Sequence, residues 1–380
     1  MSFLPYGHQS ISEEDIQAVV AILRGDWLSQ GPAVAHFEET VAEYLGVKHA
    51  VSFSNGTAAL HGAMHAAGVV KGDKVITTPM TFAATSNSAL YCGGLPLFAD
   101  ISEGTFCLDP KEVESVLKKE SVRVVAPVSF AGYPVDIDAF RALADKAGAV
   151  LIEDACQALG AVRNGHKVGF EADMTVFSFH PVKSITTGEG GMVATQSDEF
   201  AQKLRLFRSH GIIKDPALFD RPYAGGWDTD MVELGCNYRL TDIASALGTN
   251  QMKRLDGFIA RRKEIAALYE ELLKDVAGIT LPPDHPGHAH HLFCIRVDAA
   301  IRRDVFDRLK QAQLGVQVHY VPVHRYTYYQ KNFGFYEGQF PKAELFSAQA
   351  ISIPIFPDMT DADVHRVVEE IKGALSHCLS

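Results

Sequence analysis

The chain has 380 residues, a formal net charge of −11 and a sequence pI near 5.8. This negative field argues against nucleic acid or an anionic membrane as the main partner, and no apolar stretch approaches the roughly 20 residues of a membrane-spanning helix. The N-terminus lacks the pattern of a secretory signal, and the six cysteines are scattered without a CxxC pair, so we expect a cytoplasmic protein with reduced thiols.

The first two-thirds of the chain alternate helix-like and strand-like segments. Ser12 precedes three carboxylates and the apolar run IQAVVAIL, which predicts a capped helix, and residues 34–45 predict a second one. Further helix-like stretches cover residues 57–67, 82–91 and 137–147. Between these stretches lie short apolar runs: HAVSFS, KVITT, LPLFAD, VRVVAPV, AVLIED, MTVFSF and GMVAT. The alternation predicts an α/β fold with a mostly parallel sheet, whose ligands bind beyond the carboxyl ends of the strands.

The pattern changes after about residue 250. A long helical stretch (251–274) leads through LPPDHPGHAHH to strand-like HLFCIRV, a helix at 302–313, strand-like GVQVHYVPV and a terminal helix at 361–375. We therefore expect a large domain over residues 1–250 and a smaller C-terminal α+β domain over residues 251–380. The histidines between residues 285 and 291 are irregularly spaced, and we interpret this segment as a loop that enters a strand, not as a metal site.

Four segments at predicted strand ends carry groups that suit one cofactor, and the first is SNGT (residues 54–57). Gly56 and Thr57 stand at a helix N-terminus, where backbone N–H groups and the helix dipole favour a phosphate. Ordinary capping by Asn55 or Thr57 is the alternative. In the second segment, Phe82 follows a strand and could stack on a cofactor ring, with core packing as the alternative.

The third segment is VLIEDACQALGA. Asp154 ends a buried strand, where it could keep the nitrogen of a pyridine ring protonated. Gln157, one helical turn later, could hydrogen-bond the ring hydroxyl. Capping of a following helix by Asp154 is the alternative.

The fourth segment is FSFHPVKSITTGEGG. Lys183 lies in a turn rich in Ser, Thr and Gly, where partial desolvation would help it lose its charge and act as a Schiff-base nucleophile. An exposed loop lysine is the alternative. The hydroxyl of Ser178 could add a phosphate contact. A phosphate site, a stacking aromatic, a ring acid and a nucleophilic lysine in this order favour a common function over four separate coincidences.

These segments resemble the sugar aminotransferases of the DegT/DnrJ/EryC1/StrS family, a branch of the fold-type I enzymes that use pyridoxal 5'-phosphate (PLP). The resemblance covers nearly the whole chain. Besides the phrases above, it includes GDWLSQGP, LRLFRSHGI, GCNYRLTDIASALGTNQ, GVQVHYVPVH and SIPIFPDMTDADV.

The resemblance implies a role for each matching residue. Lys183 matches the lysine that binds PLP, which argues for transamination, since some relatives that act as dehydratases carry a histidine in its place. Asn237 matches an asparagine that reaches the phosphate from a neighbouring subunit, so a homodimer with shared active sites is implied. Asp154 matches the partner of the ring nitrogen, Gln157 the contact of the ring hydroxyl, and Phe82 the stacking residue. Gly56, Thr57 and Ser178 match the phosphate site.

The resemblance also suggests a substrate. TTPMTFAATSN and QVHYVPVHRYTYYQ look like members that serve pseudaminic acid synthesis, which implies transfer from L-glutamate to the C4 ketone of a UDP-linked 2-acetamido-2,6-dideoxy-hexos-4-ulose. Another nucleotide keto-sugar (C3 or C4, dTDP- or GDP-linked) and a non-catalytic PLP-binding regulator are the alternatives. Six residues lie in segments that resemble substrate-facing parts: Tyr6, Trp27, Gln30, Arg239, His319 and Tyr320. His180, three residues before Lys183, could contact the sugar, and a structural role in the turn is its alternative. Arg239 suits a carboxylate or diphosphate, and a structural ion pair is its alternative.

Overall fold

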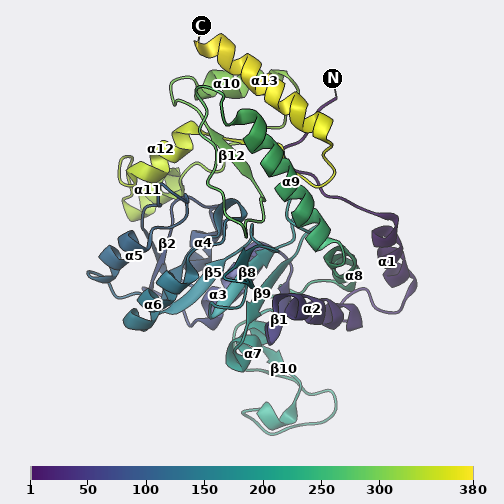
Figure 1. Ribbon diagram of the computed structural model, residues 1–380. Coiled ribbons are helices and arrows are strands. Elements are labelled where there is room, and N and C mark those ends of the chain that lie inside the picture. Colours follow the sequence, from purple (N-terminus) through teal and green to yellow (C-terminus); the bar gives the residue numbers. More distant parts are fainter. Residues whose placement is uncertain (1, 380) are drawn as a thin grey trace.

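A computed structural model describes residues 2–379 and is built on a seven-stranded sheet in the order β1-β9-β8-β5-β4-β2-β3 (Figure 1). All neighbouring strands pair in parallel except β9, which runs antiparallel to β1 and β8. The expected mostly parallel α/β sheet is therefore confirmed. The strands are β1 (His49–Phe53), β2 (Lys74–Thr77), β3 (Leu95–Phe98), β4 (Val124–Ala126), β5 (Val150–Asp154), β8 (Met174–Ser178) and β9 (Gly191–Thr195).

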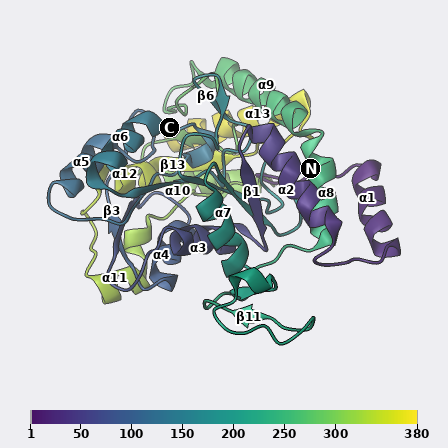
Figure 2. The same ribbon diagram turned by 90° about the horizontal axis from the view of Figure 1, so that it is seen from below.

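Helices cover both faces of this sheet (Figure 2). Successive residues of β2 show why, because Val75 packs in a cluster with α3, α4 and α7, whereas Ile76 packs with α5 and α6. Strand residues point alternately to opposite faces, so a sheet buried on both sides needs the continuous apolar runs seen in the sequence. The helices of this part are α1 (Glu13–Arg24), α2 (Pro32–Leu45), α3 (Gly56–Ala66), α4 (Ala84–Tyr91), α5 (Pro110–Leu117), α6 (Ile137–Ala147), α7 (Asp198–Phe207) and α8 (Asp242–Met252).

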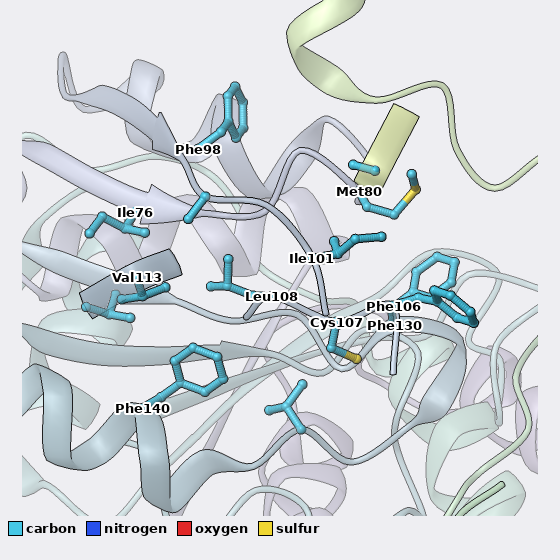
Figure 3. Close-up of a cluster of buried hydrophobic side chains, with 14 of the residues drawn as sticks. Ile76, Met80, Phe98, Ile101, Phe106, Cys107, Leu108, Val113, Phe130 and Phe140 are labelled. Atoms are coloured by element: carbon cyan, nitrogen blue, oxygen red, sulfur yellow. The ribbon is translucent and has the colours of Figure 1, made fainter. Parts of the chain in front are cut away.

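The cluster around Ile76 extends beyond the sheet (Figure 3). It brings Met80 and Phe130 from the loops after β2 and β4 together with Phe140 of α6. Val323 and Phe346 from the last quarter of the chain join the same cluster. The loops that follow the strands are thereby held between the sheet and the C-terminal part.

The C-terminal part has a core of its own, formed by α9, α10 and α13 on the antiparallel pair β12–β13. Its elements are α9 (Leu255–Leu273), β12 (Phe293–Arg296), α10 (Arg302–Gln311), α11 (Thr327–Phe333), α12 (Pro341–Gln349), β13 (Ala350–Ile353) and α13 (Asp361–Leu379). Leu4 of the N-terminal segment belongs to this core. The domain boundary near residue 250 stays a prediction.

Two expectations for this part are wrong. The helix predicted over residues 251–274 is divided between α8 and α9, because the chain turns at Lys253 and Arg254. The strand predicted for GVQVHYVPV is absent from the described chain. Its backbone instead makes single pairings with segments that are distant in the sequence. Gly315 N–H donates to the Leu4 carbonyl, Gln317 exchanges hydrogen bonds with Ser352, and Pro322 has no N–H to extend a ladder.

Short pairs of strands decorate the large part: β6 (Val162–Arg163) with β7 (His166–Lys167), and β10 (Ile212–Ile213) with β11 (Asp230–Met231). The β10–β11 segment extends away from the body (Figure 1). No helix within residues 2–379 is long and apolar enough to cross a membrane. All six cysteines are free thiols.

Candidate active site

A cavity of about 710 Å³ lies beyond the carboxyl ends of β2, β5 and β8. This is the edge at which open parallel sheets bind ligands, and the volume is within the usual range for small-molecule sites. Eleven of the fifteen residues proposed from the sequence line it: Tyr6, Gly56, Thr57, Phe82, Asp154, Gln157, Ser178, His180, Lys183, His319 and Tyr320.

Lys183 lies in the turn after β8. Its backbone N–H donates to the carbonyl of His180 at 2.9 Å, which closes the turn that Pro181 begins. The side chain is half-buried and lines the cavity, so it is not the exposed loop lysine of the alternative interpretation. Burial lowers the pKa of Lys183, although Cys156 and Asp154 act in the opposite direction. A lowered pKa favours the neutral amine that a nucleophile requires.

Asp154 is the last residue of β5 and is 5% exposed. One carboxylate oxygen, Oδ2, accepts a hydrogen bond of 2.6 Å from Thr85, and Oδ1 accepts one of 3.1 Å from the backbone N–H of Cys156. A turn follows β5, so Asp154 caps no helix, and Gln157 does not stand one helical turn later as we expected. The donor from Cys156 explains the difference, since an aspartate that binds an N–H two residues on forms a local turn.

The phosphate site predicted at Gly56 lies at the N-terminus of α3. Asn55 does cap this helix, because its side chain accepts from the N–H of Ala58 at 2.8 Å. Capping and ligand binding are compatible here, since the N–H groups of Gly56 and Thr57 have no acceptor within a helix. Ser178 is close by: a Cβ atom on Gly56 would lie 3.1 Å from Ser178 Oγ.

Two aromatic residues, Phe82 and Tyr320, form part of the cavity wall. Phe82 is 61% exposed, so core packing does not account for it. Its ring centroid lies 6.1 Å from that of Tyr320. Tyr320 accepts a hydrogen bond of 2.7 Å from Gln157 Nε2, and the Gln157 Oε1 atom accepts from Ala131 N–H. The C-terminal part thus contributes directly to the cavity.

Four residues proposed from the sequence lie outside the cavity of the single chain: Trp27, Gln30, Asn237 and Arg239. Trp27, Gln30 and Asn237 are exposed. Arg239 is half-buried and its Nε atom has no hydrogen-bond partner in the described chain, so its role as a ligand contact stays a prediction.

The sequence interpretation missed several residues of the cavity wall, among them Thr85, Cys156, Tyr238 and His291. Thr85 and Cys156 had a signal, since each lies within three residues of a proposed contact. His291 ends the histidine-rich loop, which enters β12 as predicted. Among the described residues, no group of three or more His, Cys, Asp or Glu side chains is placed to hold a metal ion.

The polar groups that line this cavity fit PLP. A helix N-terminus and the Ser178 hydroxyl suit its phosphate, and a buried carboxylate suits its ring nitrogen. Lys183 supplies an amine of lowered pKa for its aldehyde. The absence of a side chain on Gly56 matters to this fit, since its Cβ atom would fill the space beside Ser178.

Comparison with known proteins agrees with this fit. Residues 9–372 match the model of the DegT/DnrJ/EryC1/StrS aminotransferase family. The chain is 41% identical over 98% of its length, and 97% of the relative's, to a UDP-4-amino-4,6-dideoxy-N-acetyl-β-L-altrosamine transaminase of Campylobacter jejuni.

Two solved structures are similar over almost the entire chain. The first is PseC of Helicobacter pylori, an aminotransferase of pseudaminic acid biosynthesis, with a TM-score of 0.92 and 30% identity over 99% of this chain and 100% of that one. The second, from Streptococcus pneumoniae, is assigned as a sugar aminotransferase and was solved in its PLP form. It has a TM-score of 0.91 and 27% identity, and both chains are covered completely.

Proposed function

The chain belongs to the DegT/DnrJ/EryC1/StrS aminotransferase family, and from that premise we propose that it aminates the C4 ketone of a UDP-linked 2-acetamido-2,6-dideoxy-hexos-4-ulose, with L-glutamate as the amino donor. That it is a PLP-dependent nucleotide-sugar aminotransferase follows from the family and its relatives. The identity of the substrate as a UDP-linked sugar is the more specific part of the proposal, and the similarity to the Campylobacter and Helicobacter proteins supports it. This substrate would place the enzyme in pseudaminic acid synthesis.

One observation carries the PLP chemistry of the proposal: Lys183 and Asp154 line the same cavity as the N-terminus of α3. A phosphate held at Gly56 and Thr57 would fix one end of the cofactor. Asp154 would hold a proton on the ring nitrogen, and PLP so bound supplies an electron sink for the carbon next to the transferred nitrogen.

Lys183 would act as the general base and the general acid of the reaction. Its Nζ atom would take a proton from Cα of the amino donor in the first half-reaction and return a proton to C4 of the sugar in the second. Because burial lowers its pKa, the amine can accept a proton near neutral pH without holding it too tightly. His180 and His319 also line the cavity, where they could contact the sugar.

We further propose that the enzyme is a homodimer and that Asn237 of one subunit reaches the phosphate bound by the other. Asn237 is exposed and outside the cavity of its own chain. The neighbouring β10–β11 segment carries exposed apolar side chains, with Trp227 81% and Leu234 82% accessible, and a partner would cover them. The free thiols support the cytoplasm as the working compartment.

The test is a substrate screen. The purified enzyme with PLP and L-glutamate is incubated with UDP-, dTDP- and GDP-linked 3-keto and 4-keto sugars, and each product is identified by NMR. We expect the 4-amino product from the UDP-linked N-acetylated sugar at the highest kcat/KM. Preference for another keto-sugar would overturn the substrate. No formation of 2-oxoglutarate from glutamate would instead favour a PLP-binding regulator.

A further inference from the structure

Thr85 touches the carboxylate of Asp154 directly. Its Oγ1 atom lies 2.6 Å from Asp154 Oδ2, and the two residues are 1% and 5% exposed. An ionised carboxylate only accepts hydrogen bonds, so the hydroxyl proton of Thr85 points at Asp154. Short hydrogen bonds from a hydroxyl to a charged oxygen are among the strongest in proteins.

Thr81 extends this contact into a chain of two hydroxyls. Its Oγ1 atom lies 2.9 Å from that of Thr85, and Thr81 is also buried. Thr85 has a single hydroxyl proton. The carbonyl of Phe82, at 3.3 Å, is a longer and uncharged competitor for it, so we assign the proton to Asp154. Thr81 must then donate to Thr85, and the donors run in one direction from Thr81 to the carboxylate.

The carboxylate is therefore held from two different segments. Thr85 of α4 holds Oδ2, while the backbone N–H of Cys156 holds Oδ1 at 3.1 Å. Two donors, one on each oxygen, restrict rotation of the carboxylate plane. A freely rotating carboxylate would have to lose that freedom each time it bonded a ligand.

The same turn also presents an aromatic side chain to the cavity. Phe82 precedes Thr85 by three residues, and the N–H of Thr85 donates to the Phe82 carbonyl at 3.3 Å. Both residues line the cavity, but Phe82 is largely exposed there, whereas Thr85 is buried and donates to Asp154. The turn that runs from Phe82 to Thr85, at the start of α4, thus connects the proposed stacking residue Phe82 to the proposed ring acid Asp154.

We propose that Thr85 is a positioning residue for the cofactor: its hydroxyl, backed by Thr81, orients the Asp154 carboxylate toward the ring nitrogen. This rests on the proposed role of Asp154. Without the Thr85 donor, Asp154 can rotate away from the ring or turn its charge to another group. The ring nitrogen would then hold its proton less firmly, and the positive charge beside the cofactor aldehyde would weaken.

The test uses Thr85→Val, which keeps the shape of the side chain and removes the hydroxyl. We expect PLP to bind about tenfold more weakly, as is typical when a charged group loses a hydrogen bond. We also expect the pH midpoint of the visible absorption of the bound cofactor to move to higher pH. A smaller positive charge on the ring would repel a second proton less, so the nitrogen that links the cofactor to lysine would be protonated more easily. Thr85→Ser keeps the donor and should restore both values.

Ser88→Ala is the matched control. Ser88 is a fully buried hydroxyl of the same helix that donates to the Thr85 carbonyl at 2.7 Å and lies outside the cavity. This variant should lose stability without moving the absorption midpoint. Thr85→Val with an unchanged midpoint and unchanged PLP affinity would overturn the positioning role. Failure of the proposed function is distinct, since wild-type protein would then form no 2-oxoglutarate from glutamate or would prefer another keto-sugar, whereas the positioning role is judged on PLP affinity and on the absorption midpoint.

Discussion

Gln157 and Tyr320 join the sheet to the C-terminal part, because Gln157 Nε2 donates to the Tyr320 hydroxyl at 2.7 Å. Gln157 follows β5, whereas Tyr320 lies in the irregular segment before α11. We predict that Tyr320→Phe leaves this amide donor unpaired at the cavity wall and lowers the free energy of unfolding by about 1–3 kcal/mol. Urea unfolding measures this loss. Tyr326→Phe, at a tyrosine that is 39% exposed, should leave the free energy of unfolding unchanged. Equal stability of the two variants would contradict the prediction.

Gly56 should tolerate no side chain. A Cβ atom there would lie 3.0 Å from the Ser178 Cβ and 3.1 Å from its Oγ, so Gly56→Ala narrows the proposed phosphate site. We expect PLP affinity to fall by at least about tenfold, since phosphate contacts at a helix N-terminus depend on close approach of the backbone. Absorbance titration with PLP measures the affinity.

Gly257 offers the control for that substitution. It lies within α9, and a Cβ atom there would meet no atom within 4 Å. Gly257→Ala should keep wild-type PLP affinity and raise stability by about 0.5–1 kcal/mol, because alanine loses less backbone entropy in a helix. Equal PLP affinity of the two alanine variants would argue against a phosphate at Gly56.

Arg163 forms ion pairs with two carboxylates, one of which belongs to the central strand β5. Its Nη2 atom lies 3.1 Å from Glu153 and 2.9 Å from Glu171, and Glu153 is fully buried. Burial lowers the pKa of Arg163, but the two carboxylates outweigh it and the pKa is raised, so the guanidinium stays charged. Arg163→Ala would leave Glu153 buried without its cation, and we expect a loss of about 3–5 kcal/mol in urea unfolding. Arg303→Ala removes an exposed pair with Asp307 at 3.8 Å and should cost almost nothing.

Buried histidines should make the fold sensitive to acid. Burial lowers the pKa of His61, His290 and His319 to about 4. In the unfolded chain these groups titrate near about pH 6.5. Between the folded-state and unfolded-state pKa values, the unfolded state therefore binds more protons than the folded state. The free energy of unfolding should be highest above the unfolded-state pKa and should fall as the pH drops toward the folded-state pKa. Urea midpoints at about pH 7 and about pH 5 measure the slope, and a midpoint that stays constant or rises on acidification contradicts the assignment.

Much of the fold could be predicted from local patterns. The apolar runs of the sheet, such as AVLIED and MTVFSF, are buried on both faces and lack the alternation that would confuse them with surface strands. The helix at Ile137–Ala147 begins and ends where its cap residues Asp136 and Gly148 indicate. These signals lie within a few residues of the element that they define.

The errors arose where distant segments determine the structure. GVQVHYVPV has the composition of a strand, but the N-terminal segment and Ser352 take its hydrogen bonds. The break between α8 and α9 has no proline or glycine to mark it. At Lys253 and Arg254 the side chains bond Asn250 and Asp15, and the second of these is far away in the sequence.

The site shows the same division. Gly56, Asp154 and Lys183 could be found because each follows a strand, and strand ends meet at one edge of a parallel sheet. His291 could not, since its place in the wall depends on how the loop before β12 approaches that edge. The sequence also indicates a turn at Asp154 only in retrospect, because aspartate suits a helix cap and a local turn equally well.

The central claim is that Lys183 carries the cofactor. Purified protein incubated with excess PLP, reduced with sodium borohydride and digested should yield a single pyridoxyl-labelled peptide with the label on Lys183. Lys183→Ala should give no label while still binding PLP without a covalent bond. Label on another lysine, or none in the wild-type protein, would contradict the account.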